Sequence, residues 1–277
     1  MNARSLILIF SICLLTCALV SAQDKQTSNS SQTASDQDIG PRKARNPLAD
    51  KTSFALDHAF SFKSGPLERT GYELDASIVA PTRITDEWLF LHRATLRLVR
   101  DPESFPGQGT RFGLGDFTYE ALFTRNRNSR MIWGAGPAFV IPTATSSRLG
   151  SGKWSLGPAA GMVSQPGHWT FGALAFNTWS IAGSSDRNQV NQLTLEPFVS
   201  YDLKGDWFVS SRPQISADWK APRGERWTMP FGGGGGKGFA RGEKNIFVSV
   251  FAYYNVERPP GSSPWQFSFG LEFLFNK

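Results

Sequence analysis

The stretch from Trp265 to Phe275 constrains the fold of this chain more than any other. Its odd-numbered positions are all large and apolar, whereas its even-numbered positions are Gln, Ser, Gly, Glu and Leu. Successive side chains of a strand point to opposite faces, so this stretch predicts a strand with one apolar face and one mostly polar face. The length suits a strand that crosses a bilayer at a tilt, and strands cross a bilayer only in a closed barrel. The alternative is an edge strand of a soluble sandwich.

The N-terminal residues predict export from the cytoplasm. Arg4 precedes a short apolar run from Leu6 to Val20, and small residues up to Ala22 form a cleavage site for signal peptidase. We therefore expect a mature chain that begins at Gln23.

The expected processing leaves a chain without cysteine. Both cysteines, Cys13 and Cys17, precede Ala22, so cleavage there excludes a disulfide, a thiolate nucleophile and a cysteine-ligated metal. The alternative is a lipoprotein acylated at Cys17, because residues 14–17 form a loose lipobox, although Thr16 is unusual in its place.

The sequence divides into three parts. We interpret residues 1–22 as the signal peptide and residues 47–277 as the barrel. Residues 23–46 are rich in Ser, Gln, Asp and Thr and almost free of apolar residues, which predicts a short disordered periplasmic leader. After the signal peptide no run of 18 apolar residues occurs, so the sequence predicts no transmembrane helix.

Alternating segments divided by turn residues fill the chain from about Thr52 onward. We predict twelve strands, at approximately 53–62, 72–80, 88–99, 113–124, 131–142, 153–164, 168–181, 190–202, 207–219, 226–238, 245–255 and 265–275. An even number of strands suits a bacterial barrel with both chain ends in the periplasm. The predicted fold class is therefore all-β, a transmembrane antiparallel β-barrel of about 12 strands in the bacterial outer membrane.

Tryptophan placement agrees with this prediction. All nine tryptophans lie near a predicted strand end, as the aromatic girdles at the two membrane interfaces require. The periplasmic girdle is predicted at Trp88, Trp133, Trp169 and Trp207. The outer girdle is predicted at Trp154, Trp179, Trp219, Trp227 and Trp265.

Charged residues in the predicted strands indicate a polar lumen. A Lys or Arg on the lipid face at mid-membrane costs about 2–4 kcal/mol, so charged positions are assigned to the interior. The candidate lumen-lining residues are Asp75, Arg93, Arg97, Asp116, Glu120, Gln192, Glu196, Arg212, Gln214, Asp218 and Glu272. Segments 131–142 and 153–164 carry too few polar residues for an assignment. Twelve strands suit either a narrow channel or a plugged barrel.

One glycine-rich run could indicate a binding site for phosphate. Gly232 to Gly236 followed by Lys237 approaches a phosphate-binding loop, but Phe231 and Gly238 occupy positions that this motif reserves for Gly and for Ser or Thr, so we predict a glycine-rich strand or turn.

The histidines His58, His92 and His168 raise the question of hydrolysis by a His–Ser pair. None has a Ser at a spacing that places both on one face with a carboxylate behind, and no His, Asp and Glu cluster is visible in the sequence. We therefore predict no enzyme activity, no cofactor and no metal.

Several segments together resemble one bacterial family. They are Gly113–Asp116 (GLGD), Trp133–Pro137 (WGAGP), Ile141–Thr145 (IPTAT), Leu149–Trp154 (LGSGKW), Gly157–Ala160 (GPAA), Val190–Gln192 (VNQ) and Pro197–Phe198. The chain, over about residues 46–277, is similar to the exported barrels grouped as "putative MetA-pathway of phenol degradation" and often labelled neuromedin U. One departure concerns the terminus, because Asn276 and Lys277 follow Phe275, whereas such barrels often end on the aromatic residue.

The resemblance implies an outer-membrane barrel that passes small, aromatic or hydrophobic molecules, with no established catalytic residue. Our leading hypothesis is a channel or transporter, and the alternatives are a non-transporting structural or surface barrel and a membrane-embedded lipid hydrolase. The expected partners are outer-membrane lipid, a small-molecule solute and the barrel-insertion machinery. Nucleic acid is not expected, because the basic residues that give the formal net charge of +6 are scattered.

A first prediction concerns processing. Cleavage after Ala22 should yield a cysteine-free protein in the outer-membrane fraction, which intact-mass measurement can verify. A diacylglycerol adduct on Cys17 would instead identify a lipoprotein.

Overall fold

The computed structural model of this protein describes Leu48 and residues 50–125, 131–241 and 244–275. The predicted signal peptide and leader lie outside the described residues, as does the C-terminal departure at 276–277. None of the described helices is long and apolar enough to span a membrane.

Nearly all regular structure in these residues is strand. The strands are β1 (Thr52–Ser64), β2 (Arg69–Arg83), β3 (Trp88–Asp101), β4 (Arg111–Leu114), β5 (Phe117–Arg125), β6 (Met131–Ile141), β7 (Lys153–Ser164), β8 (Trp169–Gly183), β9 (Asn191–Asp202), β10 (Trp207–Ser211), β11 (Ile215–Asp218), β12 (Trp227–Arg241), β13 (Lys244–Glu257) and β14 (Trp265–Phe275). One short 3-10 helix, η1 (Lys204–Asp206), precedes β10. Each predicted strand has a counterpart at nearly the same boundaries.

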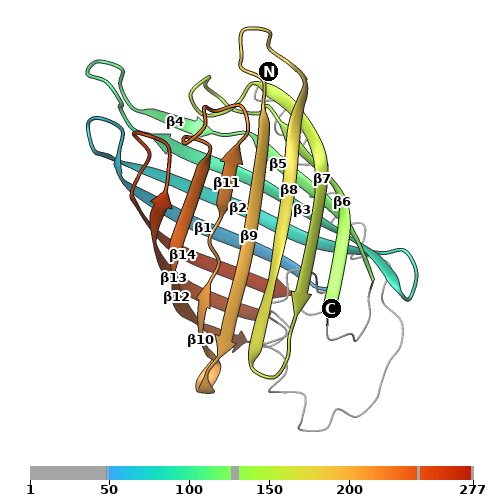
Figure 1. The fold of residues 1–277 in the computed structure, drawn as a ribbon. Helices are drawn as coiled ribbons and strands as arrows, with labels where there is room; N and C mark the ends of the chain where they lie inside the picture. Colours follow the sequence, from blue (N-terminus) through green and yellow to red (C-terminus); the bar gives the residue numbers. More distant parts are fainter. Residues whose placement is uncertain (1–47, 49, 126–130, 242–243, 276–277) are drawn as a thin grey trace, which may run out of the picture. The chain divides into compact units, whose positions relative to one another are not determined.

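The strands close into a barrel, which confirms the predicted fold (Figure 1). Its wall has 12 antiparallel strand positions, which we call staves. Two staves are each built of two strands, because β4 and β5 both pair with β3, and β10 and β11 both pair with β9 and β12. Closure comes from β1, which pairs with β2 along one side and with β14 along the other. No edge of the sheet is then left open, as a bilayer requires.

The break between β10 and β11 has a backbone cause. Ser211 is opposite Val199 and Ile215 is opposite Leu195 in β9, so the register is the same on both sides of the break. At its centre stands Pro213, which lacks an N–H and cannot donate to the ladder. The neighbouring backbone N–H of Arg212 donates instead to the hydroxyl of Tyr253, at 3.1 Å. The stave therefore keeps its inside and outside faces across the interruption.

The two ends of the barrel differ in their connections. At one end the turns are short, namely 84–87, 165–168 and 203–206. At the other end lie the longer loops 102–110, 142–152, 184–190, 219–226 and 258–264, together with one short turn, 65–68. We assign the short-turn end to the periplasm, because outer-membrane barrels have short periplasmic turns and longer outer loops.

The glycine run of β12 is part of a strand. Residues from Phe231 to Arg241 pair in continuous register with β13, so Gly232–Gly236 form barrel wall rather than a loop. The prediction of a glycine-rich strand or turn is thus confirmed in the first form. Strand β12 ends at Arg241, and β13 begins at Lys244.

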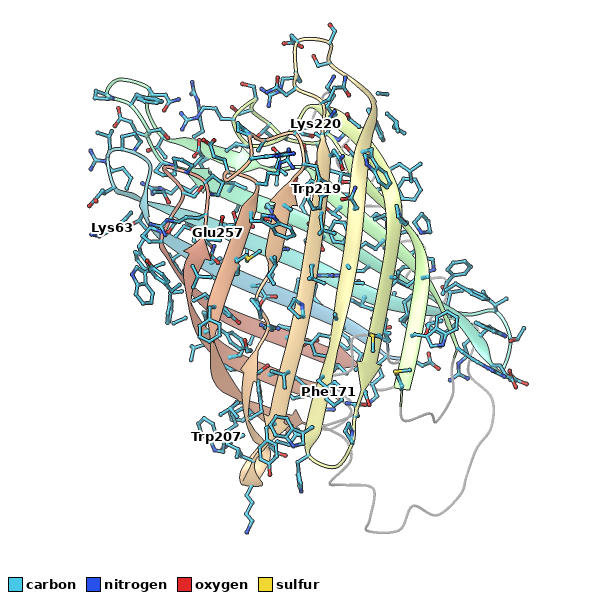
Figure 2. The ribbon with its side chains drawn as sticks, in the orientation of Figure 1. Lys63, Phe171, Trp207, Trp219, Lys220 and Glu257 are labelled. Atoms are coloured by element: carbon cyan, nitrogen blue, oxygen red, sulfur yellow. The ribbon has the colours of Figure 1, made fainter. Side chains whose placement is uncertain are left out.

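The outer face of the barrel is apolar and aromatic. In β14, Phe267 and Phe269 are exposed, whereas Gln266 and Ser268 line the interior cavity. Figure 2 places Trp207 and Phe171 near the short-turn end and Trp219 near the other end. Six of the nine predicted girdle tryptophans keep between 45% and 54% of their surface exposed, and they are Trp133, Trp154, Trp169, Trp179, Trp207 and Trp265. Trp88, Trp219 and Trp227 are half-buried.

The facing of β14 gives a second prediction. Phe269→Arg should lower the free energy of unfolding by about 2–4 kcal/mol, because it places a charge in hydrocarbon. Ser268→Arg should cost less, because its charge meets the water and carboxylates of the lumen. Heat-modifiable gel mobility and reversible unfolding would rank the two variants, and a more harmful Ser268→Arg would contradict the facing.

Candidate functional site

A cavity of about 410 Å³ lies inside the barrel and is the candidate site. It is lined by side chains from staves on all sides, including β1, β3, β9 and β14. The sequence-predicted residues that line it are Asp75, Arg93, Glu196, Arg212, Gln214 and Glu272.

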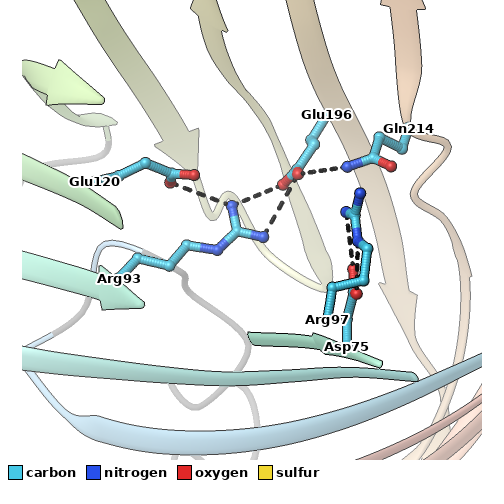
Figure 3. Close-up of polar contacts among 6 residues, drawn as sticks. All are labelled: Asp75, Arg93, Arg97, Glu120, Glu196 and Gln214. Carbon is cyan, nitrogen blue, oxygen red and sulfur yellow. Dashed lines mark hydrogen bonds and ion pairs between the residues drawn. The ribbon is translucent and has the colours of Figure 1, made fainter. Parts of the chain in front are cut away.

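Arg93 connects opposite parts of the wall. Its Nη1 atom lies 2.9 Å from Oε2 of Glu196 and 3.4 Å from Oε2 of Glu120, and its Nη2 atom lies 3.4 Å from Oε1 of Glu196 (Figure 3). Glu120 is on the adjacent stave, but four staves separate β3 from β9 along the sheet. The Arg93–Glu196 pair therefore crosses the lumen. Gln214 extends the network by donating from Nε2 to Oε1 of Glu196 at 3.2 Å.

A second crossing pair joins β1 to the β10–β11 stave. Nη2 of Arg212 lies 2.9 Å from Oδ1 of Asp57, although three strands stand between the two residues along the sheet. The guanidinium also lies over the ring of Phe251, 4.7 Å from its centroid. Gly270 leaves the space for this contact, because a Cβ there would come within 2.8 Å of Asp57 Oδ1 and 2.9 Å of Arg212 Nη2.

Arg97 is held on one side of the lumen. Its Nε atom lies 3.0 Å from Oδ1 of Asp75 and 3.0 Å from Oε1 of Glu73, both on the neighbouring strand β2. We call the whole set the charged belt: Asp57, Glu73, Asp75, Arg93, Arg97, Glu120, Glu196, Arg212 and Gln214. Its five carboxylates outnumber its three guanidinium groups, so in the ionised state the belt carries two excess negative charges.

The excess charge has a direct chemical consequence. A ring of carboxylates in a narrow lumen attracts cations and repels anions. The pairs also narrow the passage, since Arg93 and Arg212 extend across it rather than along the wall. The belt thus places excess negative charge and two crossing ion pairs in the lumen.

Two belt residues, Asp57 and Glu73, were missed in the sequence. The signal for Asp57 was present, because Phe54, Leu56 and His58 alternate around it and would place it on the inner face. The partner of Asp57 could not have been read, because Arg212 lies 155 residues away in the sequence. Glu73, in contrast, pairs with Arg97 on the neighbouring strand.

Asp116 lies at the break between β4 and β5 and holds an outer loop. Its Oδ2 atom accepts hydrogen bonds from the backbone N–H of Ser151 at 2.7 Å and from the Ser151 hydroxyl at 2.8 Å. Gly150 must be small here, because a Cβ would come within 2.3 Å of Asp116 Oδ1. Asp116 therefore fastens loop 142–152 and does not line the central cavity.

Gln192 and Asp218 lie in a different place from the belt. They line a smaller hollow of about 310 Å³ at the outer end, together with Ser151 and residues 186–190. In the same outer loop the hydroxyl of Ser184 donates to the carboxylate of Asp186, which lowers the pKa of that carboxyl.

The three histidines lie outside the cavity lining. Nδ1 of His58 is 2.8 Å from the hydroxyl of Tyr72, and Nδ1 of His92 is 2.7 Å from the hydroxyl of Tyr119. Each tyrosine thus satisfies a polar ring nitrogen on the lipid-facing side of the wall. His168 lies in a periplasmic turn beside the ring of Tyr201. Among the described residues no group of three or more His, Cys, Asp or Glu is arranged to hold a metal.

Comparison with known proteins agrees with the geometry. Residues 69–180 match the model of the family described as "Putative MetA-pathway of phenol degradation". The family resemblance is confirmed. Segments 113–116 and 149–154, which helped to suggest it, are joined in the structure by the Asp116–Ser151 hydrogen bonds.

Two outer-membrane proteins are among the solved structures that share the fold. The COG4313 outer membrane channel from Pseudomonas putida F1 superposes with a TM-score of 0.62 at 14% identity, covering 89% of this chain and 100% of that chain. The NanC porin superposes with a TM-score of 0.50 at 12% identity, covering 81% and 100% respectively. Curated protein sequences gave no significant match. With its closed wall and apolar outer face, the protein is an outer-membrane β-barrel.

The crossing pairs give a third prediction. Arg93→Met leaves Glu120, only 3% exposed, and Glu196 without their cation. Because the Arg93 side chain itself keeps 29% exposure, we expect a loss of about 1–3 kcal/mol in the free energy of unfolding rather than the full cost of a deeply buried pair. Urea unfolding of the barrel in lipid vesicles, followed by tryptophan fluorescence, would measure it.

Matched variants separate this effect from general damage. Arg125→Met removes an arginine from an exposed pair with Glu87 and should cost less than about 1 kcal/mol. Adding Glu120→Gln to Arg93→Met should recover part of the loss, because it removes the buried charge. Equal losses for Arg93→Met and Arg125→Met would mean that the crossing pair contributes little.

Proposed function

We propose that this protein is an outer-membrane channel for small molecules, aromatic or hydrophobic ones among them. The observation that carries the proposal is the cavity within a closed barrel, which side chains of the charged belt narrow. Side-chain ion pairs can separate and re-form, so they leave a path that a solute can use. In this proposal the belt is the selective element and favours neutral or cationic solutes over anions.

Two comparisons support the proposal. The P. putida structure that shares the fold is described as an outer membrane channel. The description of the matched family names phenol degradation, which suggests a solute with a single aromatic ring. Export through the signal peptide 1–22, contact with outer-membrane lipid and assembly by the barrel-insertion machinery belong to the same proposal.

We also propose that the protein has no enzyme activity. A lipid hydrolase needs a nucleophile within hydrogen-bond reach of its base. The ring contacts that the structure gives to His58 and His92 are tyrosine hydroxyls and aromatic rings. Lipid hydrolysis that is lost on substitution of His58 or His168 would contradict this part of the proposal.

Ion selectivity in planar bilayers tests the channel and provides a fourth prediction. The purified protein should conduct, and Arg212→Glu should raise the permeability ratio of cations to anions because it adds negative charge to the belt. Lys204→Glu makes the same charge change in the exposed turn before β10 and should shift the ratio much less.

Two outcomes would contradict the prediction in different ways. A folded protein without conductance would favour the structural barrel over the channel. Conductance with unchanged selectivity in Arg212→Glu would mean that the belt does not face the ion path.

A further inference from the structure

On the periplasmic side of the charged belt, many of the side chains that face the lumen are apolar rather than charged. On β3 the next inward-facing residue after Arg93 in that direction is Leu91, and on β5 Glu120 is followed by Leu122. The same change to apolar side chains occurs on other staves, at Val79, Phe198, Phe208, Phe247 and Leu274, all of which line the cavity. Below the belt the lining is mostly apolar, with Lys51, Ser53, Thr170, Ser200 and Glu272 as its polar members, and we call this part of the cavity the apolar chamber.

Small residues on β6 and β7 complete one wall of this chamber. Ala138 and Ala159 are fully covered from solvent. Gly136 and Gly157 cannot carry larger side chains, because a Cβ would come within 1.9 Å of the Ala121 carbonyl oxygen and 1.7 Å of the Asn177 carbonyl oxygen. The short side chains of Ala138 and Ala159 leave room for Leu48, which packs in one cluster with them.

Leu48 occupies part of that space. It precedes β1, belongs to no strand, and is only 5% exposed. It packs in one cluster with Leu89, Leu91, Leu122, Ala138, Ala159 and Val163, and it also lines the cavity. Two residues further on, Asp50 accepts a hydrogen bond from Nε of Arg83 at 2.7 Å, at the periplasmic end of β2. This contact fixes the chain at the rim while Leu48 points into the chamber.

We infer that the chamber is a binding site for a small uncharged apolar molecule of about the size of one aromatic ring, and that Leu48 occupies the site until such a molecule displaces it. The inference rests on the proposed function for the route by which a solute arrives, but binding itself requires no conduction. Apolar walls favour transfer of an apolar solute from water. The carboxylate excess of the adjacent belt disfavours an anion of the same size.

Thiol labelling tests the inference and is the fifth prediction. The protein purified from the outer membrane would carry Leu48→Cys or, as the matched control, Leu203→Cys, and the unsubstituted protein serves as the blank. Leu203 lies in the β9–β10 turn at the same end of the barrel and is 47% exposed. A small water-soluble maleimide should modify Cys at position 48 at least about tenfold more slowly than Cys at position 203, because the first is packed in the chamber.

Adding a solute to the labelling reaction then distinguishes a chamber that binds apolar molecules from one in which position 48 is merely buried. Toluene should speed modification at position 48 several-fold and leave position 203 unchanged, whereas benzoate, a charged molecule of similar size, should affect neither. Leu48 is outside the strands, so heat-modifiable mobility should confirm that both variants fold.

Two results would overturn the inference: equal labelling rates at the two positions without solute, or no response of position 48 to toluene. Absence of conductance would bear only on the proposed channel, because the labelling rates do not depend on it.

Discussion

Pairing of every backbone N–H and C=O group is the constraint on which the rest of this structure depends. Hydrocarbon offers these groups no partner, so the sheet must close on itself, and the pairing of β1 with β14 closes it. Where Pro213 interrupts the ladder, the hydroxyls of Tyr253 and Ser211 bond to the backbone at Arg212 and Gly232 instead. Closure then fixes which residues share the lumen and how far apart opposite walls lie.

Within that wall, polar and apolar groups are sorted along the axis. Charged side chains gather at mid-height, where Arg93 and Arg212 reach carboxylates on the far side. Nearer the periplasm, leucine side chains pack around Leu48. Phe208, Phe247 and Leu274 form a second buried cluster. The charged groups of an ion pair across a lumen stay partly in contact with water. Such a pair therefore separates more readily than a deeply buried one. The same arrangement can therefore stiffen the barrel and, in the channel that we propose, admit a solute.

Three of the segments that carry the family resemblance, 113–116, 141–145 and 149–154, hold an outer loop in place. Asp116 binds Ser151, and Thr143 donates from Oγ1 to the carbonyl oxygen of Gly115 at 3.0 Å, so loop 142–152 is fastened to the break between β4 and β5. Arg187 of the next outer loop donates to the carbonyl oxygen of Gly150 at 2.6 Å. These contacts explain why small and hydroxyl-bearing residues occur there, and they say nothing about a substrate.

The sequence by itself determined the strands, their number and the facing of most of them. Alternation is local, and the cost of a charge in lipid decides which face is inside, so residues such as Glu196 could be assigned from their neighbours alone. On β6 and β7 alanine occurs on both faces and polar residues are few, so the pattern gave no facing. Only the tertiary structure paired Arg93 with Glu196, 103 residues away, and Arg212 with Asp57, 155 residues away. It also placed Leu48 in the chamber. Contacts across a lumen are set by barrel closure and curvature, which no local periodicity encodes.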